Sequence, residues 1–187
     1  RVRKHYNSKI LSRNKSERVS LTIIHESLNL TIGDKSLSWI RNNIIRINTD
    51  ANVSVKPDGW NKDALSGYVF LCVDNIDLRR EIVESNMTNM FLKAVFDFRT
   101  ALQSAQHYAA DWKDYDQKRR LLSTMQFSHE EAAEATPTSA CGRTIGVVTT
   151  VRLVCDFGGN NFISFVRGDG IKKAVLVDGF QFTLDAF

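Results

Sequence analysis

Residues 67–75, Gly-Tyr-Val-Phe-Leu-Cys-Val-Asp-Asn, form an almost continuous apolar run that stops at two polar side chains. A run of this kind is typical of a β-strand buried on both faces, as in a parallel sheet covered by helices. Residues 77–87 follow with apolar side chains at helical spacing, and residues 90–96 form a second apolar run that ends at Asp97-Phe-Arg99. Strand, helix and strand in this order predict a βαβ unit and an α/β fold.

The segments on either side of this unit are consistent with the same fold class. Before it we expect a strand over 19–24, an amphipathic helix over 34–47 and a strand over 51–55. After it we expect an extended segment over 101–110, a highly charged stretch over 111–120 and a surface crossover over 128–140. A long helix is expected over 143–167, weakened or broken at Gly158-Gly159. The chain should close with a hairpin between strands 174–177 and 180–184 around Asp178-Gly179.

Composition indicates a globular protein. The chain has 187 residues, of which 43% are hydrophobic and 25% charged, and its apolar stretches are too short to cross a bilayer. Because it begins at Arg1 without a signal peptide, we expect a fragment or processed product. Three irregularly spaced cysteines predict neither a disulfide framework nor zinc, and favour a reducing, cytoplasmic setting.

The net charge of +4 is unevenly distributed. Residues 1–46 hold ten Lys and Arg against three Asp and Glu, so the excess of positive charge belongs to the amino-terminal part. A basic segment can bind nucleic acid with steep salt dependence, but here the basic residues alternate with Ser and Asn and lack interleaved aromatics. Nucleic acid is therefore an unfavoured partner. We divide the chain into a basic segment, 1–32, and an α/β domain, 33–187.

Asp74 is the first candidate site residue, because ligands of open α/β sheets collect beyond the carboxyl ends of parallel strands. A carboxylate placed there by a rigid strand is a suitable Mg²⁺ ligand, since Mg²⁺ takes one or two carboxylates together with phosphate oxygens and water. The alternative is that Asp74 only caps the helix that begins near Asp77. The spacing alone favours neither interpretation.

Cys141 is the second candidate, because it lies in a polar, Gly-flanked stretch before an expected helix, where Arg143 would favour a thiolate. The alternative is a cysteine without a catalytic role. Cys72 and Cys155 lie inside apolar patterns and are expected to be core residues. His129 and the glutamates after it have poor spacing for a metal site and predict a solvated acidic face. The sequence contains no glycine-rich phosphate-binding motif.

The stretch Gly67-Tyr-Val-Phe-Leu-Cys-Val-Asp-Asn-Ile-Asp-Leu-Arg79, with Arg41-Asn-Asn-Ile-Ile-Arg-Ile-Asn48 before it, resembles the ThiF/MoeB family of ubiquitin-activating-type adenylyltransferases. Asp97-Phe-Arg99 is similar to an Asp-x-Arg motif of phage and bacterial ThiF-like proteins. Residues 129–137 and 141–146 resemble their crossover loop and the start of the next helix. The resemblance covers about residues 33–187, and it implies a Rossmann-like mixed sheet flanked by helices.

The resemblance also implies an activity. Asp74 would bind Mg²⁺ and the phosphates of ATP with Asn75 beside it, Arg79 would match the arginine of the same motif, and Lys35 would reach ATP. Cys141 would match a cysteine that bonds to the carrier protein. The implied reaction is attack by the C-terminal carboxylate of a ubiquitin-like or sulfur-carrier protein on the α-phosphate of ATP, in a homodimeric enzyme.

The sequence departs from the family pattern in its amino-terminal part. The family's glycine-rich nucleotide loop would precede Gly33, and residues 1–32 do not contain it. Lys35 is one residue early for the family lysine, and the zinc-binding cysteine pairs of many members are absent. These departures favour an alternative, in which the chain is a non-catalytic ThiF-like binding module or partner subunit.

Overall fold

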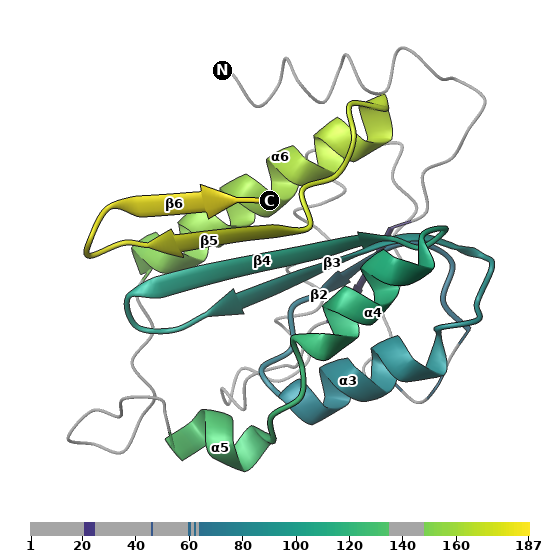
Figure 1. Cartoon of the computed structure of the whole chain (residues 1–187), viewed down its shortest axis with the longest axis horizontal. Coiled ribbons are helices and arrows are strands. Elements are labelled where there is room, and N and C mark those ends of the chain that lie inside the picture. Colours follow the sequence, from purple (N-terminus) through teal and green to yellow (C-terminus); the bar gives the residue numbers. More distant parts are fainter. Residues whose placement is uncertain (1–20, 25–45, 47–59, 61, 63, 135–147) are drawn as a thin grey trace.

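A six-stranded mixed sheet forms the middle layer of the molecule, with helices on both faces (Figure 1). The computed structural model describes residues 21–24, 46, 60, 62, 64–134 and 148–187. The α/β class expected from the sequence is confirmed, and the sheet is open. The helix expected over 34–47, apart from the helical Arg46, and the strand expected over 51–55 lie outside the described residues.

The six strands follow one another across the sheet in chain order. The first three run parallel, and each later strand pairs antiparallel with the one before it. Their bounds are β1 (Leu21–Ile24), β2 (Gly67–Leu71), β3 (Leu92–Thr100), β4 (Ser104–Asp111), β5 (Ala174–Asp178) and β6 (Thr183–Ala186). The expected βαβ unit is therefore confirmed as β2, α3 and β3.

Helices α3 (Ile76–Ser85) and α4 (Tyr115–Ser123) cover one face of the sheet, and α6 (Val148–Arg167) covers the other (Figure 1). The short helix α5 (His129–Glu134) falls in the expected crossover and contacts α3. The charged stretch from 111 to 120 contains the start of α4, in which Leu121 is the buried residue. Most of this helix is charged or polar, and only its last turn carries adjacent leucines, so the sequence shows a charged stretch rather than an apolar helical stripe.

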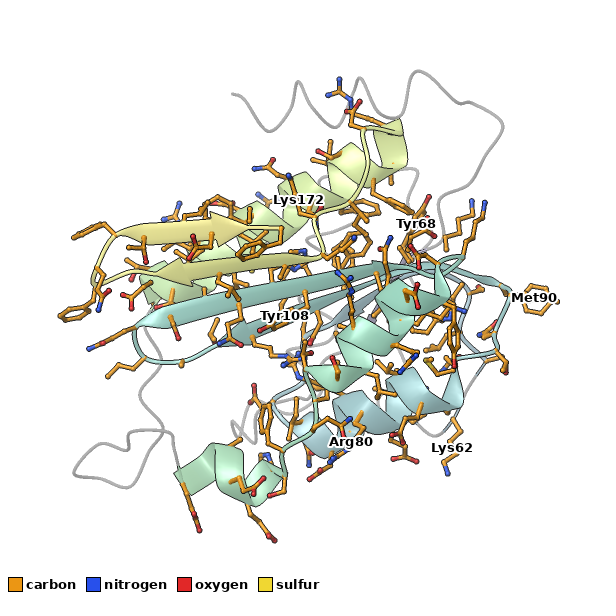
Figure 2. The ribbon with its side chains drawn as sticks, viewed as in Figure 1. Lys62, Tyr68, Arg80, Met90, Tyr108 and Lys172 are labelled. Carbon is orange, nitrogen blue, oxygen red and sulfur yellow. The ribbon has the colours of Figure 1, made fainter. Side chains whose placement is uncertain are left out.

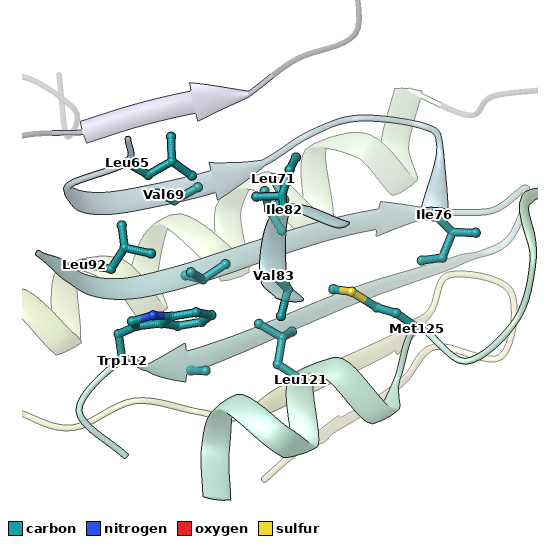
Figure 3. Packing of buried hydrophobic residues seen from close by; sticks show 12 residues of the cluster. Leu65, Val69, Leu71, Ile76, Ile82, Val83, Leu92, Trp112, Leu121 and Met125 are labelled. Atoms are coloured by element: carbon teal, nitrogen blue, oxygen red, sulfur yellow. The ribbon is translucent and has the colours of Figure 1, made fainter. Parts of the chain in front are cut away.

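Each face of β2 meets a different core. Val69 and Leu71 pack with α3 and α4 residues in an aliphatic cluster (Figure 3), whereas Tyr68 and Phe70 pack with aromatic residues of β3 and α6. The ring centroids of Phe70 and Phe162 lie 5.2 Å apart in an edge-to-face arrangement. Burial on both faces explains why the sequence of β2 is continuously apolar rather than alternating.

Helix α6 runs without interruption through Gly158 and Gly159, so the expected weakness or break there is wrong. A Cβ atom added at Gly158 would lie 2.1 Å from Cε1 of Phe98, whereas one added at Gly159 meets nothing within 4 Å. Gly158 therefore lets the helix backbone lie directly against β3. Glycine serves close packing here rather than a change of chain direction.

The carboxyl-terminal hairpin has a longer loop than the Asp-Gly pair predicts. Asp178 pairs with Thr183, and its Oδ1 accepts hydrogen bonds from the backbone N–H groups of Phe180 and Gln181 at 2.8 and 2.9 Å. The last strand therefore begins at Thr183 rather than at Phe180. The aspartate side chain closes the loop, which is its usual role in turns.

Candidate functional site

The carboxyl ends of three parallel strands meet at one edge of the sheet. Ile24 of β1, Leu71 of β2 and Asp97 of β3 lie side by side in the strand register. Asp74 follows β2 by three residues and is exposed. Among the described residues, no hydrogen bond or ion pair of its carboxylate is present.

Asn75, not Asp74, caps the helix that follows. The Oδ1 atom of Asn75 accepts hydrogen bonds from the backbone N–H groups of Asp77 and Leu78 at 2.9 and 3.1 Å. This is the usual arrangement of a helix N-cap, so the interpretation of Asp74 as the cap is wrong. The cap fixes the start of α3 immediately beside Asp74.

Arg79 is buried under the end of β2, with 5% of its surface exposed. Its Nη1 donates to the carbonyl oxygen of Leu71 at 3.4 Å and to the carboxylate of Asp97, and its Nη2 donates to the carbonyl oxygen of Val73. The guanidinium therefore faces the protein interior, where its charge is paired with that of Asp97.

Asp97 links two arginines. It is fully buried, and its Oδ2 accepts a hydrogen bond from Nε of Arg99 at 2.7 Å. Arg99 also donates to the backbone oxygen and the hydroxyl of Thr124, each at 2.8 Å, and its guanidinium lies 4.7 Å from the ring centroid of Tyr108. The Asp-x-Arg stretch therefore connects β3 to the segment after α4.

On the opposite face of the sheet, a buried histidine continues this network. Nδ1 of His107 donates to the backbone oxygen of Asp97 at 3.0 Å, while its Nε2 accepts from Nδ2 of Asn161 in α6 at the same distance. Burial lowers the pKa of His107 to about 4, against the opposing effect of the hydrogen bond to Asp97. The imidazole is therefore neutral at neutral pH.

Helix α5 contacts the first turn of α3, close to this edge of the sheet. The backbone N–H of His129 donates to Oδ2 of Asp77 at 3.1 Å, and Asp77 also pairs with Arg80. Arg80 on α3 and Tyr108 on β4 can be located in Figure 2. Glu130, Glu131 and Glu134 are exposed, and the described part of the chain contains no group of three side chains suited to a metal ion.

The cysteines differ in their surroundings. Cys155 on α6 is exposed, so its expected place in the core is wrong, and Cys72 is half-buried. Burial raises the pKa of the Cys72 thiol to about 11, and partial burial also raises the pKa of Cys155. Neither thiol is predominantly a thiolate at neutral pH. Cys141 and Lys35 lie outside the described residues.

The structure thus brings together Asp74, Asn75 and Arg79 at the end of β2, and it adds a residue that sequence reasoning did not select. Asp97 entered the sequence analysis only as part of a motif, yet it is the common partner of Arg79 and Arg99. The available signal was an acidic residue between two phenylalanines, Phe96 and Phe98, of a strand, since a buried carboxylate requires a charged or polar partner.

None of the helices in the described part of the chain combines the length and apolar character that a membrane crossing requires. Comparison with known proteins yields neither a matching family model nor a matching curated protein. The ThiF/MoeB resemblance therefore stays a hypothesis for this chain.

Solved structures provide a likeness in fold. The crystal structure of selenomethionine PaaA matches with a TM-score of 0.62 at 9% identity, over 100% of this chain and 72% of that one. The E. coli microcin synthetase McbBCD complex has a TM-score of 0.49 at 12% identity, over 97% of this chain and 72% of that one. The heterocyclase TruD has a TM-score of 0.49 at 9% identity, over 95% of this chain and 27% of that one. This α/β chain therefore has a fold similar to that of PaaA.

Proposed function

We propose that this chain belongs to an ATP-dependent adenylyltransferase that activates the C-terminal carboxylate of a small carrier protein, ubiquitin-like or sulfur-carrying. The observation that carries the proposal is the position of Asp74. Its carboxylate is exposed at the edge where three parallel strands end, and this is the edge at which ligands of open α/β sheets bind. The resemblance to the ThiF/MoeB family around Asp74 supports the same interpretation.

Asp74 is suited to hold Mg²⁺. Its carboxylate is exposed, and Mg²⁺ needs only one or two carboxylates when phosphate oxygens and water complete its shell. A bound Mg²⁺ would neutralise part of the phosphate charge of ATP. In the proposed reaction a carboxylate oxygen forms a bond to the α-phosphorus, and the bond from that phosphorus to pyrophosphate breaks. The chain's own residues would act by positioning and charge.

The other residues of the proposed site have distinct roles. Asn75 would hold the start of α3 beside the bound phosphates through its cap. Lys35 would contact ATP. The thiolate of Cys141 would attack the adenylated carboxyl group of the carrier, so that a thioester bond forms and the bond to AMP breaks. The homodimer and the cytoplasmic setting expected from the sequence remain predictions.

One observation favours a second candidate function, a ThiF-like binding module without activity. The resemblance includes Arg79 among the functional residues, yet its guanidinium is buried and paired with Asp97. A module that retained the fold alone would keep this buried pair. Nucleotide binding separates the two candidates.

The test is calorimetric titration of the folded chain with MgATP. We expect binding by the original chain and a loss of at least tenfold in affinity for Asp74→Asn, which keeps the size of the side chain but removes its charge, as for other ligands of a metal. Asp185→Asn is the matched control, because Asp185 is exposed on the outer strand β6, which three other strands separate from β2.

Equal affinity for MgATP in the original chain and in Asp74→Asn would contradict the assignment of Asp74. Absence of binding by the folded chain would instead support the binding module. A similar loss in Asp185→Asn would indicate a general charge effect rather than a local site.

A further inference from the structure

The path of the chain just after β2 depends on one buried side chain. Val73 is 1% exposed, and its carbonyl oxygen accepts a hydrogen bond from Nη2 of Arg79. Nη1 of the same guanidinium contacts the carbonyl oxygen of Leu71 at 3.4 Å. A buried carbonyl group requires a donor, and Arg79 provides one on each side of Cys72, immediately before Asp74.

The position of the guanidinium is itself fixed from two sides. Asp97, which is fully buried, pairs with Nη1 of Arg79, while its other carboxylate oxygen is held by Arg99. The backbone N–H of Arg79 donates to the carbonyl oxygen of Asn75 at 3.2 Å, within the first turn of α3. Asp74 therefore lies between a strand end and a helix start that both contact Arg79.

We propose that Arg79 is a positioning residue, which sets the path of residues 72–74 and so the direction of the Asp74 carboxylate. The inference rests on the proposed function, in which that carboxylate holds Mg²⁺. Arg79 acts from beneath the strand and touches neither metal nor nucleotide. A planar guanidinium can donate to several acceptors at fixed angles, whereas the ammonium group of Lys is a point charge on a flexible stem.

Arg99 provides a matched control, because it shares the Asp97 carboxylate but contacts Thr124 instead of the strand-end carbonyl groups. The variants Arg79→Lys and Arg99→Lys thus carry the same substitution on the same buried partner. If Arg79 only contributed to stability, both variants would lower the unfolding temperature and neither would act specifically on the Mg²⁺ dependence.

The experiment measures binding of the fluorescent analogue mant-ATP as Mg²⁺ is titrated, together with the unfolding temperature of each variant. For Arg79→Lys we expect the Mg²⁺ concentration at half-saturation to rise about tenfold, as is usual when a residue that orients a metal ligand is replaced. For Arg99→Lys we expect a change of less than about twofold. Equal changes in the two variants, or no change in Arg79→Lys, would overturn the proposal.

A second variant covers the case in which Arg79→Lys does not fold. Arg79→Met combined with Asp97→Asn removes both charges of the pair and keeps an acceptor for Arg99, since a buried ion pair can often be replaced by neutral residues of similar volume. This double variant should raise the half-saturating Mg²⁺ concentration in the same way. A folded double variant with the original Mg²⁺ dependence would also overturn the proposal.

Hydrogen exchange separates failure of this inference from failure of the proposed function. If the original chain does not bind mant-ATP, the proposed function is wrong, but the positioning role still predicts faster amide exchange over residues 72–76 in Arg79→Lys than in Arg99→Lys. Unchanged exchange over 72–76 would overturn the positioning role independently of nucleotide binding.

Discussion

At the scale of single residues, the chain holds several polar side chains inside the fold and gives each of them a partner. Asp97 and His107 are fully buried, and Asn161 is 6% exposed. Asn161 also donates to the backbone oxygen of Lys172 and accepts from its N–H, each at 2.8 Å. Because a buried polar group without a hydrogen bond is costly, these side chains restrict how β3, β4 and α6 pack together.

His107 makes stability depend on pH in a defined direction. Its pKa is lowered to about 4 by burial, so between about pH 6.5 and pH 4 the unfolded chain takes up a proton that the folded chain does not. The free energy of unfolding should therefore fall as pH falls through this range, by an amount on the order of 3 kcal/mol. Urea unfolding at a series of pH values measures the change.

The control for this prediction is His107→Gln, which keeps a donor and an acceptor but does not titrate. The variant should lose the part of the pH dependence that belongs to His107. Above about pH 7.5, the free energy of unfolding should change with pH at the same rate in the two proteins. An unchanged slope between pH 6.5 and pH 4 in His107→Gln would contradict the assignment.

At the scale of elements, the sequence predicts those segments whose own apolar side chains are buried in a regular pattern along the chain. The apolar run of β2 and the helical spacing of α3 both reflect contacts with a layer on each side. Helix α4 was not predicted, because its helical character rests on the Asp114 cap and on charged residues rather than on an apolar face. The role of Gly158 in α6 could not be predicted either, since its close approach to Phe98 involves a distant strand.

The two glycines of α6 provide a prediction with an internal control. Gly158→Ala should destabilise the fold by about 1–3 kcal/mol, because the new methyl group would overlap the Phe98 ring, which is packed among aromatic side chains. Gly159→Ala should instead stabilise it by about 0.5–1 kcal/mol through helix propensity, since a Cβ there meets nothing within 4 Å. Chemical denaturation measures both.

A partial recovery of stability when Gly158→Ala is combined with Phe98→Leu would locate the overlap at this contact, because residues in contact show non-additive effects. Equal effects of the two alanine substitutions would show that Gly158 has no special packing role.

At the scale of the whole molecule, the candidate site follows from topology more than from any one motif. Asp74 could be selected from the sequence because a buried strand ends just before it. The Arg79 and Asp97 pair could not, because the two residues are 18 positions apart and meet only when β2 and β3 adopt their parallel register. Lys35 and Cys141 remain predictions from the resemblance.

The sheet also separates the candidate site from the rest of the surface. Asp74 lies at the carboxyl end of β2, whereas β6 is an outer strand, separated from β2 by three others, with all of its residues exposed. A third region, on α4, forms a surface hollow lined by Arg119 and Arg120 together with Asp116 and Ser123. These three regions are distinct, so the location of a bound nucleotide can be decided by a local probe.

The most direct test of the central claim is to locate the nucleotide by nuclear magnetic resonance, with Mn²⁺ and ATP added to the isotopically labelled chain. Mn²⁺ binds the oxygen ligands that suit Mg²⁺ and broadens the signals of nearby amides. The account predicts early broadening at Asp74 and Asn75, while the amides of Thr183–Ala186 stay sharp. Broadening centred on Arg119 and Arg120, with Asp74 and Asn75 unaffected, would contradict it.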